Sequence, residues 1–229
     1  MLALRKIELE SLLKEKHLFP NFSSFSSDFQ EKLGTSLPAL NDLLSGGLPR
    51  GQISEITGPI SSGKSSLLYS VLAQATRQRE VVACVDCNQF DPWSAYRSGL
   101  DLKKLLWVRC SQSYQLLKAA DILCNAGNFG VIALDMINLK RAGLYGPDVW
   151  FRLQRIVEGT KTVLLVLSVH PQARTASRLT LSLKKKDLYW EGRQSTWKLL
   201  QGFSMEVNCA RGKRDMTKVL VSRQSRKTA

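Results

Sequence analysis

Eight consecutive residues have the types and the spacing of a phosphate-binding loop. The run Gly58-Pro-Ile-Ser-Ser-Gly-Lys-Ser65 matches the pattern G-x-x-x-x-G-K-[ST]. Backbone N–H groups of such a loop, together with the positive end of the helix that follows, hold phosphate groups. We expect Lys64 to reach the β and γ phosphates and the Ser65 hydroxyl to ligate Mg²⁺. The candidate phosphate-binding residues are Gly58, Pro59, Ser61, Ser62, Gly63, Lys64, Ser65 and Ser66.

A second acidic group is needed to hold the metal ion through water, and Asp135 is the candidate. It follows four apolar residues, Val131–Leu134, that have the composition of a buried strand. Many buried strands end in an aspartate, so Asp135 is a candidate metal ligand only in combination with Lys64. The predicted ligands of Mg²⁺ are therefore Ser65 and Asp135. A loop that binds no ligand is the alternative, and the position of the match between a strand and an amphipathic helix argues against it.

Positive charge is concentrated toward the end of the chain. Lysine and arginine together number 33 against 19 acidic residues, which gives a formal net charge of +14. Contact with nucleic-acid phosphates would explain this excess, and a solvated basic surface explains it equally well, so both interpretations stay open. The candidate nucleic-acid residues, in the densest clusters, are Lys184, Lys185, Lys186, Arg211, Lys213 and Arg214.

Short apolar runs alternate with amphipathic stretches along most of the chain. This alternation predicts a mostly parallel sheet between helices, which is an α/β fold. Strands are expected at 52–57, 81–85, 105–108, 131–134 and 162–169, and helices from 64 and at 92–97, 113–125 and 147–157. Beyond Arg178 only strands are expected, at 179–183, 188–190, 197–200, 205–209 and 218–222. We interpret these as an antiparallel extension of the same sheet.

The N-terminal stretch differs from the rest. Residues 1–18 have the composition of a helix that is apolar on two sides, and a Ser-rich connector follows at 21–27. We divide the chain into an N-terminal helix and linker (1–33), a nucleotide-binding core (34–183) and a basic, strand-rich extension (184–229). No apolar run is long enough to span a membrane, and acidic residues stand where a secretory signal keeps its apolar block. We therefore expect a cytoplasmic protein, associated with the nucleoid if it contacts DNA.

The phosphate loop and its flanks resemble the RecA family. The similarity is carried by Gly46-Gly-Leu-Pro-Arg-Gly51, Ile53-Ser-Glu-Ile-Thr-Gly-Pro59, Asp91-Pro92, Ser98–Leu106 and Val131–Asp135. It covers the chain from about residue 34 to residue 169. The resemblance implies a RecA-like core that binds ATP and Mg²⁺, with Asp91 among the nucleotide-binding residues.

Four positions, at three places in the chain, depart from the family's pattern. Asn88 stands where the resemblance implies a glutamate that activates the attacking water, and an amide cannot accept a proton near neutral pH. Ser94 stands where a tyrosine stacks on adenine, and Ser168-Val169 stands where an Asn-Gln pair senses the γ-phosphate. The two loops that grip DNA in recombinases also look shortened. We expect nucleotide binding to persist and hydrolysis and strand exchange to be weakened, so no catalytic residue is assigned.

The architecture as a whole is similar to that of the ImuA group, RecA-like proteins associated with mutagenic translesion DNA synthesis. That resemblance implies an accessory protein of the SOS response that works with a Y-family-like polymerase subunit and a replicative-type polymerase. It leaves contact with DNA and self-association open. The alternative is an active DNA-dependent ATPase of recombinase or recombination-mediator type. Such an enzyme would need a water-activating carboxylate other than position 88, and Glu55 and Asp86 are the candidates.

Overall fold

The computed structural model describes residues 31–87, 90–137, 145–191, 199–211 and 217–223. The strands are β1 (Lys32–Leu33), β2 (Leu48–Pro49), β3 (Gln52–Thr57), β4 (Val81–Asp86), β5 (Leu105–Arg109), β6 (Phe129–Asp135), β7 (Val163–Leu167), β8 (Leu179–Glu191), β9 (Leu199–Arg211) and β10 (Thr217–Arg223). The helices are α2 (Pro38–Leu43), α3 (Lys64–Arg77), α4 (Pro92–Arg97), α5 (Ser113–Ala126) and α6 (Pro147–Val157), with short 3₁₀ turns η1 (Leu102–Lys104) and η2 (Arg174–Ala176). The predicted helix 1–18 and the connector 21–27 lie outside the described residues.

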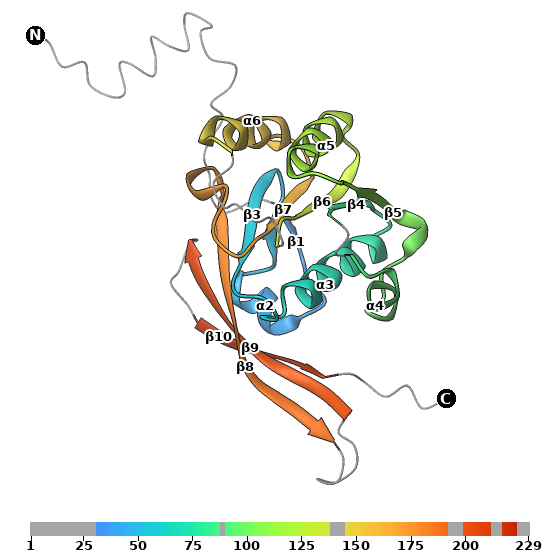
Figure 1. Ribbon diagram of the computed structural model, residues 1–229, viewed down its shortest axis with the longest axis vertical. Coiled ribbons are helices and arrows are strands. Elements are labelled where there is room, and N and C mark those ends of the chain that lie inside the picture. The colour runs from blue at the N-terminus through green and yellow to red at the C-terminus, as the bar shows by residue number, and fades with distance from the viewer. Residues whose placement is uncertain (1–30, 88–89, 138–144, 192–198, 212–216, 224–229) are drawn as a thin grey trace, which may run out of the picture. The chain divides into compact units, whose positions relative to one another are not determined.

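Eight strands form one sheet in the order β10-β9-β8-β3-β7-β6-β4-β5 (Figure 1). In this order, the six neighbouring strands β8, β3, β7, β6, β4 and β5 pair in parallel. The pairs β8–β9 and β9–β10 are antiparallel. β1 and β2 make a separate two-stranded sheet. The predicted α/β class, with a mostly parallel sheet and antiparallel strands at its C-terminal end, is confirmed.

Helices cover both faces of the parallel part of the sheet. On one face α3 contributes Leu67, Leu68 and Leu72 to a buried cluster with the strand residues beneath it. On the other face α5 and α6 contribute Leu116 and Trp150 to a second cluster. Strands buried on both faces need apolar residues at consecutive positions, which explains the uninterrupted apolar runs of β6 and β7.

The carboxyl ends of the parallel strands meet at one edge of the sheet, which is where ligands bind in folds of this kind. The loop 58–63 follows β3 and leads into α3. Asp135 is the last residue of β6, and Asp86 is the last residue of β4. Because β6 lies between β7 and β4 in the sheet, this topology brings positions far apart in the sequence to the same edge.

The two long strands β8 and β9 form a ribbon that projects from the sheet (Figure 1). Only the first four residues of β8, Leu179–Ser182, pair with β3, and the rest of β8 pairs with β9 alone. The sequence predicted two strands, 179–183 and 188–190, where the structure has one continuous strand. The polar run Lys184–Asp187 interrupts the apolar alternation, but the ladder with β9 continues past it, with a register shift between Lys185 and Leu188.

Among the residues that the structure describes, no helix is long and apolar enough to cross a membrane.

Candidate nucleotide-binding site

Two positions of the loop between β3 and α3 have backbone conformations that favour glycine. Gly58 has φ +143° and Gly63 has φ +96°, values that side chains disfavour. A β-carbon at Gly58 would collide with the carbonyl oxygen of Leu183 in β8. At Gly63 it would lie 2.9 Å from the ring of Phe203 in β9. The two glycines therefore let the loop pack closely against the β8–β9 ribbon.

Lys64 begins α3 and turns its side chain back into the loop. Its ammonium nitrogen donates to the carbonyl oxygens of Gly58 at 2.5 Å and Pro59 at 2.6 Å, and to the hydroxyl of Ser62 at 3.4 Å. The residue is only 3% exposed. Burial lowers the pKa of Lys64, and the nearby charge of Asp135 opposes that change. The ammonium group thus lies where phosphate oxygens can replace the loop carbonyls as its partners.

Asp135 lies at the end of β6, facing the same cavity as Lys64. It is 5% exposed, and one of its carboxylate oxygens accepts from the backbone N–H of Ile137 at 3.0 Å. Burial raises the pKa of Asp135 to about 6, and Asp86 adds to the rise while the Ile137 N–H and Lys64 oppose it. A buried carboxylate of this kind is a suitable partner for a divalent cation, which favours its ionised form.

Ser65, in the first turn of α3, lines the cavity together with Asp135. No cluster of three or more His, Cys, Asp or Glu side chains suited to a metal ion occurs among the described residues. A Mg²⁺ ion here would therefore complete its oxygen shell with water and phosphate, as Mg²⁺ commonly does in nucleotide sites. Ser65 and Asp135, the two predicted ligands, are brought together by the fold, and the donor set fits the ion.

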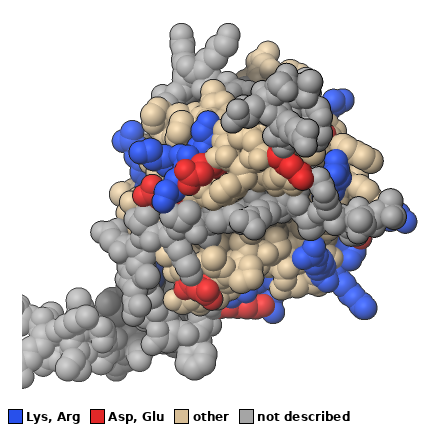
Figure 2. Space-filling view, turned by 90° about the horizontal axis from the view of Figure 1, so that it is seen from below, with Lys and Arg blue, Asp and Glu red and all other residues tan. Residues whose placement is uncertain are grey.

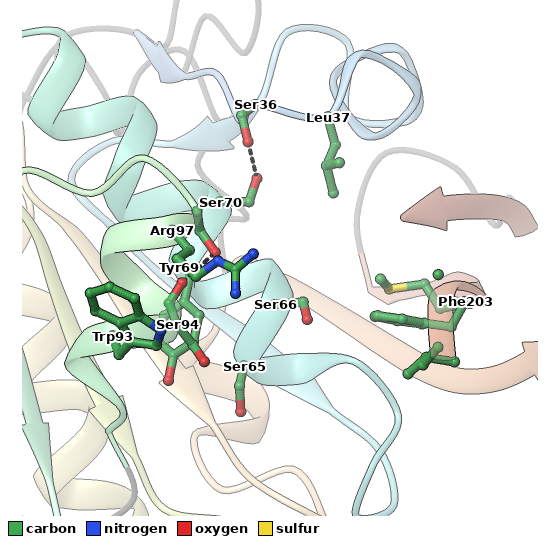
Figure 3. A pocket seen from close by; sticks show the side chains of 14 residues that line it. Ser36, Leu37, Ser65, Ser66, Tyr69, Ser70, Trp93, Ser94, Arg97 and Phe203 are labelled. Carbon is green, nitrogen blue, oxygen red and sulfur yellow. Dashed lines mark hydrogen bonds between the residues drawn. The ribbon is translucent and has the colours of Figure 1, made fainter. Parts of the chain in front are cut away.

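Two adjoining cavities surround the loop. The first, about 550 Å³, is bounded by the loop residues 60–66, by Asp135 and Ile137, and by side chains of the β8–β9 ribbon. The second, about 660 Å³, lies between α3, α4 and β9 (Figure 3). Ser65, Ser66, Leu200 and Phe203 line both. Each volume is in the range of small-molecule sites, and the shared walls make them two ends of one candidate site.

The second cavity is bounded by α4, the helix after Asp91. Trp93, Ser94 and Arg97 lie on one side of it and Phe203 on the other (Figure 3). Trp93 is 66% exposed, so its ring is available to a ligand. Comparison with the family's pattern indicates the loss of a stacking tyrosine at Ser94 and does not identify the adjacent tryptophan as a replacement. The available signal was that Trp93 directly precedes Ser94.

Asp91 acts as the N-terminal cap of α4 in this structure. Its carboxylate oxygens accept from the backbone N–H of Trp93 at 3.1 Å and of Ser94 at 3.2 Å. Hydrogen bonds from Ser94 are the largest cause that lowers the pKa of Asp91. Asp91 does not line either cavity. It therefore positions the helix that carries the lining residues, and a direct contact with nucleotide stays a prediction.

The two carboxylates considered as substitutes for position 88 are fully buried. One oxygen of Glu55 accepts from the backbone N–H groups of Gln172 and Ala173, both at 2.7 Å. Asp86 accepts from the N–H of Phe90 at 2.6 Å and from the indole of Trp107 at 2.8 Å. A general base must reach the water that it deprotonates, and both of these groups are shielded from solvent. Asn88 itself lies outside the described residues.

Ser168, at the position of the expected γ-phosphate sensor, is engaged within its own loop. Its hydroxyl donates to the carbonyl oxygen of His170 at 2.8 Å, and the residue is 1% exposed. It lines neither of the two cavities. The site thus has phosphate-binding groups, whereas Glu55 and Asp86 are not placed to activate an attacking water and Ser168 is not placed to sense the terminal phosphate.

Of the two basic clusters, the structure describes the side chains of only the first. Lys184, Lys185 and Lys186 are exposed on β8, whereas the backbone of Arg211 pairs with Thr180 near the start of that strand. The side chain of Arg211 and residues 212–216, which include Lys213 and Arg214, lie outside the described residues. On the face in Figure 2, basic side chains lie in separate groups with acidic ones among them.

Comparisons with known proteins show which family the chain resembles. The family model of the RecA N-terminal domain matches residues 27–142, slightly more than half of the chain. The chain is 42% identical over 93 residues to RecA of Methylococcus capsulatus and to RecA of Ectopseudomonas oleovorans, and 37% identical over 93 residues to RecA of Thermus aquaticus. Each match covers 40% of this chain and 27% of the relative, so the chain matches about a quarter of the length of these curated relatives.

Proposed function

The chain belongs to the RecA N-terminal domain family, and on that premise we propose that it binds ATP with Mg²⁺ at the loop Gly58–Ser65 and hydrolyses it weakly or not at all. In this proposal it is an accessory protein of DNA damage tolerance rather than a recombinase. Bound ATP serves as a structural ligand of the core.

One contrast within the site carries the proposal. The groups suited to holding phosphate and Mg²⁺, namely Lys64, Ser65 and Asp135, all line one open cavity. The carboxylates that could replace a general base, Glu55 and Asp86, are fully buried and hydrogen-bonded. Groups that bind without a group that activates water favour retention over turnover.

Each residue of the site has a distinct task in binding. Backbone N–H groups of the loop and the N-terminus of α3 would hold the phosphate chain. Lys64 would exchange the carbonyls of Gly58 and Pro59 for phosphate oxygens, whose negative charge adds an ionic attraction to the hydrogen bonds. Ser65 and Asp135 would hold the cation, which neutralises phosphate charge when bound. Trp93 offers a ring surface for the base.

The accessory role rests on the similarity to the ImuA group and on the departures from the family's pattern at Asn88 and at Ser168-Val169. We propose a Y-family-like polymerase subunit and a replicative-type polymerase as partners, in translesion synthesis during the SOS response. Exposed lysines of β8 are our candidates for contact with DNA. The recombinase-type alternative has no supporting contact among the described residues, and the experiment below separates the two.

The first test is ATP binding and turnover by the purified chain, with and without single-stranded DNA. We expect the wild type to bind ATP and the Lys64→Ala variant to lose that binding, because the variant lacks the buried ammonium group. Turnover should stay negligible when DNA is added. Robust DNA-stimulated hydrolysis would overturn the accessory reading in favour of the recombinase-type enzyme.

A gain-of-function variant sharpens this test. Asn88→Glu places a carboxylate where the family resemblance implies a general base, so turnover should rise at least tenfold over the wild type. Asn88→Gln is the matched control, since it has the same side-chain length and no basic oxygen. Equal turnover in the two variants would mean that the missing base does not limit hydrolysis.

A further inference from the structure

The β8–β9 ribbon supplies one wall of the cavity around the phosphate loop. Leu188 from β8 and Leu200 and Phe203 from β9 are the apolar side chains of this wall. Lys185, also from β8, lines the same cavity and is the only charged side chain among its ribbon residues. A cation on an otherwise apolar wall, facing a phosphate-binding loop, calls for a chemical explanation.

Strand alternation separates Lys185 from its neighbour Lys184. From Leu181 to Lys185 the ladder with β9 is regular, so side chains alternate between the two faces of the ribbon. Leu181 and Leu183 are each 1% exposed and face the core, which places Lys185 on that same face. Lys184 belongs to the opposite face of the ribbon, although both lysine side chains are exposed to solvent.

Cross-strand partners give the same assignment. Lys185 pairs with Met205, which is 1% exposed, and a β-carbon at Gly63 would lie 3.1 Å from the Met205 methyl group. Lys184 pairs with Glu206, an acidic residue that lies on its own face of the ribbon. The ribbon position opposite Met205 therefore faces the phosphate loop, and the position opposite Glu206 faces away from it.

With a nucleotide bound, the cavity would hold more negative charge than Lys64 and one Mg²⁺ neutralise, which favours a second cationic side chain. A nucleoside triphosphate keeps a net negative charge even when one Mg²⁺ is bound, and Asp135 adds negative charge to the same cavity. Lys64 is the one cation that the loop itself provides. Lysine on a long, flexible stem is a common phosphate partner because its ammonium group acts as a compact point charge.

We propose that Lys185 contacts the phosphate chain of the nucleotide from the ribbon side, as a phosphate-binding residue of the same chain. This inference rests on the proposed nucleotide binding and names a ligand contact that the loop motif does not contain. The run Lys184–Lys186 then serves two purposes. Lys185 belongs to the nucleotide site, and Lys184 remains on the outer face for other partners.

The test compares neighbouring lysines of one strand in the full chain. Dissociation constants are measured for ATP, ADP and adenosine with the wild type, Lys185→Ala and the matched control Lys184→Ala. We expect Lys185→Ala to weaken ATP binding about tenfold, as for loss of a charge-assisted hydrogen bond, and Lys184→Ala to change it less than about twofold. Lys185→Arg should retain most of the affinity. The affinity for adenosine should be unaffected by all three substitutions.

The possible outcomes separate failure of this inference from failure of the proposed nucleotide binding on which it rests. If the wild type binds ATP and the two alanine variants bind it equally well, Lys185 is not a phosphate contact and the inference fails alone. An equal loss of adenosine affinity in Lys185→Ala would also overturn it, because the contact would not be to phosphate. If the wild type binds neither nucleotide, the proposed function fails and the inference fails with it.

Discussion

The buried carboxylate of Asp135 lowers the stability of the fold and is also a proposed ligand of Mg²⁺. Its pKa of about 6 in the folded chain lies above the ordinary value of 3.8, mainly because the carboxyl is buried. The folded state therefore holds a proton that the unfolded state has already lost between about pH 4 and pH 6. Stability falls as the pH rises through that window, and above it the cost stays constant at about 3 kcal/mol.

Replacement of Asp135 by asparagine should move stability and ligand binding in opposite directions. Asp135→Asn removes the buried charge and keeps an oxygen for the Ile137 N–H, so the free energy of unfolding at pH 7.5 should rise by up to about 3 kcal/mol. Below pH 4 the variant and the wild type should be equally stable. Urea denaturation at the two pH values measures this difference.

The same substitution removes a proposed Mg²⁺ ligand, so Mg²⁺-dependent ATP affinity should fall at pH 7.5. The wild type should also lose this affinity as the pH drops through about 6, where Asp135 becomes protonated. The terminal phosphate of ATP titrates in the same range. The pH dependence of ATP affinity that remains in Asp135→Asn measures the contribution of that phosphate. A variant with unchanged stability at pH 7.5 would show that the charge of Asp135 is already compensated in the folded chain.

At the scale of elements, α4 shows how a residue can act through the helix that it caps. Asp91→Ala removes both side-chain acceptors from the first turn of α4 and should lower the Tm. Asp91→Asn keeps one acceptor oxygen for the first turn of α4, and asparagine is as good an N-terminal cap as aspartate in general, so it should retain most of the Tm and the ATP affinity. Thermal unfolding and ATP titration of the two variants test this expectation. If Asp91→Asn lost ATP affinity at an unchanged Tm, Asp91 would contact the nucleotide directly, as the family resemblance implies.

The helices and parallel strands were predictable because local pattern and tertiary environment agree there. The expected helices 92–97 and 147–157 have the same bounds in the structure, where a proline stands at the first turn of each. The ribbon was less predictable. Hydrogen bonding to β9 carries β8 through the polar stretch at Lys184–Asp187, and no local apolar pattern records such pairing.

At the scale of the whole described core, the site is assembled from segments that are far apart in the sequence. The loop 58–65 and Asp135 were predictable because they follow apolar strands with a recognised spacing. The ribbon wall was not, since Phe203 meets Gly63 only through the pairing of β9 with β8 and of β8 with β3. For the same reason the sequence grouped three lysines as one cluster, although strand alternation sends Lys184 and Lys185 to different faces.

The basic ribbon makes a prediction that tests nucleic-acid contact separately from nucleotide binding. If Lys184 and Lys186 contact phosphates of single-stranded DNA, their double replacement by alanine should reduce the slope of log affinity against log salt by about 1.4, roughly 0.7 for each contact. Affinity should fall to a similar extent for unrelated DNA sequences, because phosphate contacts carry no sequence information. Fluorescence anisotropy across a series of salt concentrations provides the slopes.

A control with the same loss of charge decides what the slope means. Lys103 and Lys118 are exposed on η1 and α5, and their replacement by alanine lowers the net charge equally without altering the ribbon. Local phosphate contact predicts that only the ribbon variant loses slope, because counterions are released where a side chain neutralises a phosphate. A general attraction by the net charge of +14 predicts equal changes in both variants. Equal changes would leave the ribbon as a solvated basic surface, and the nucleotide cavity as the site through which the chain acts.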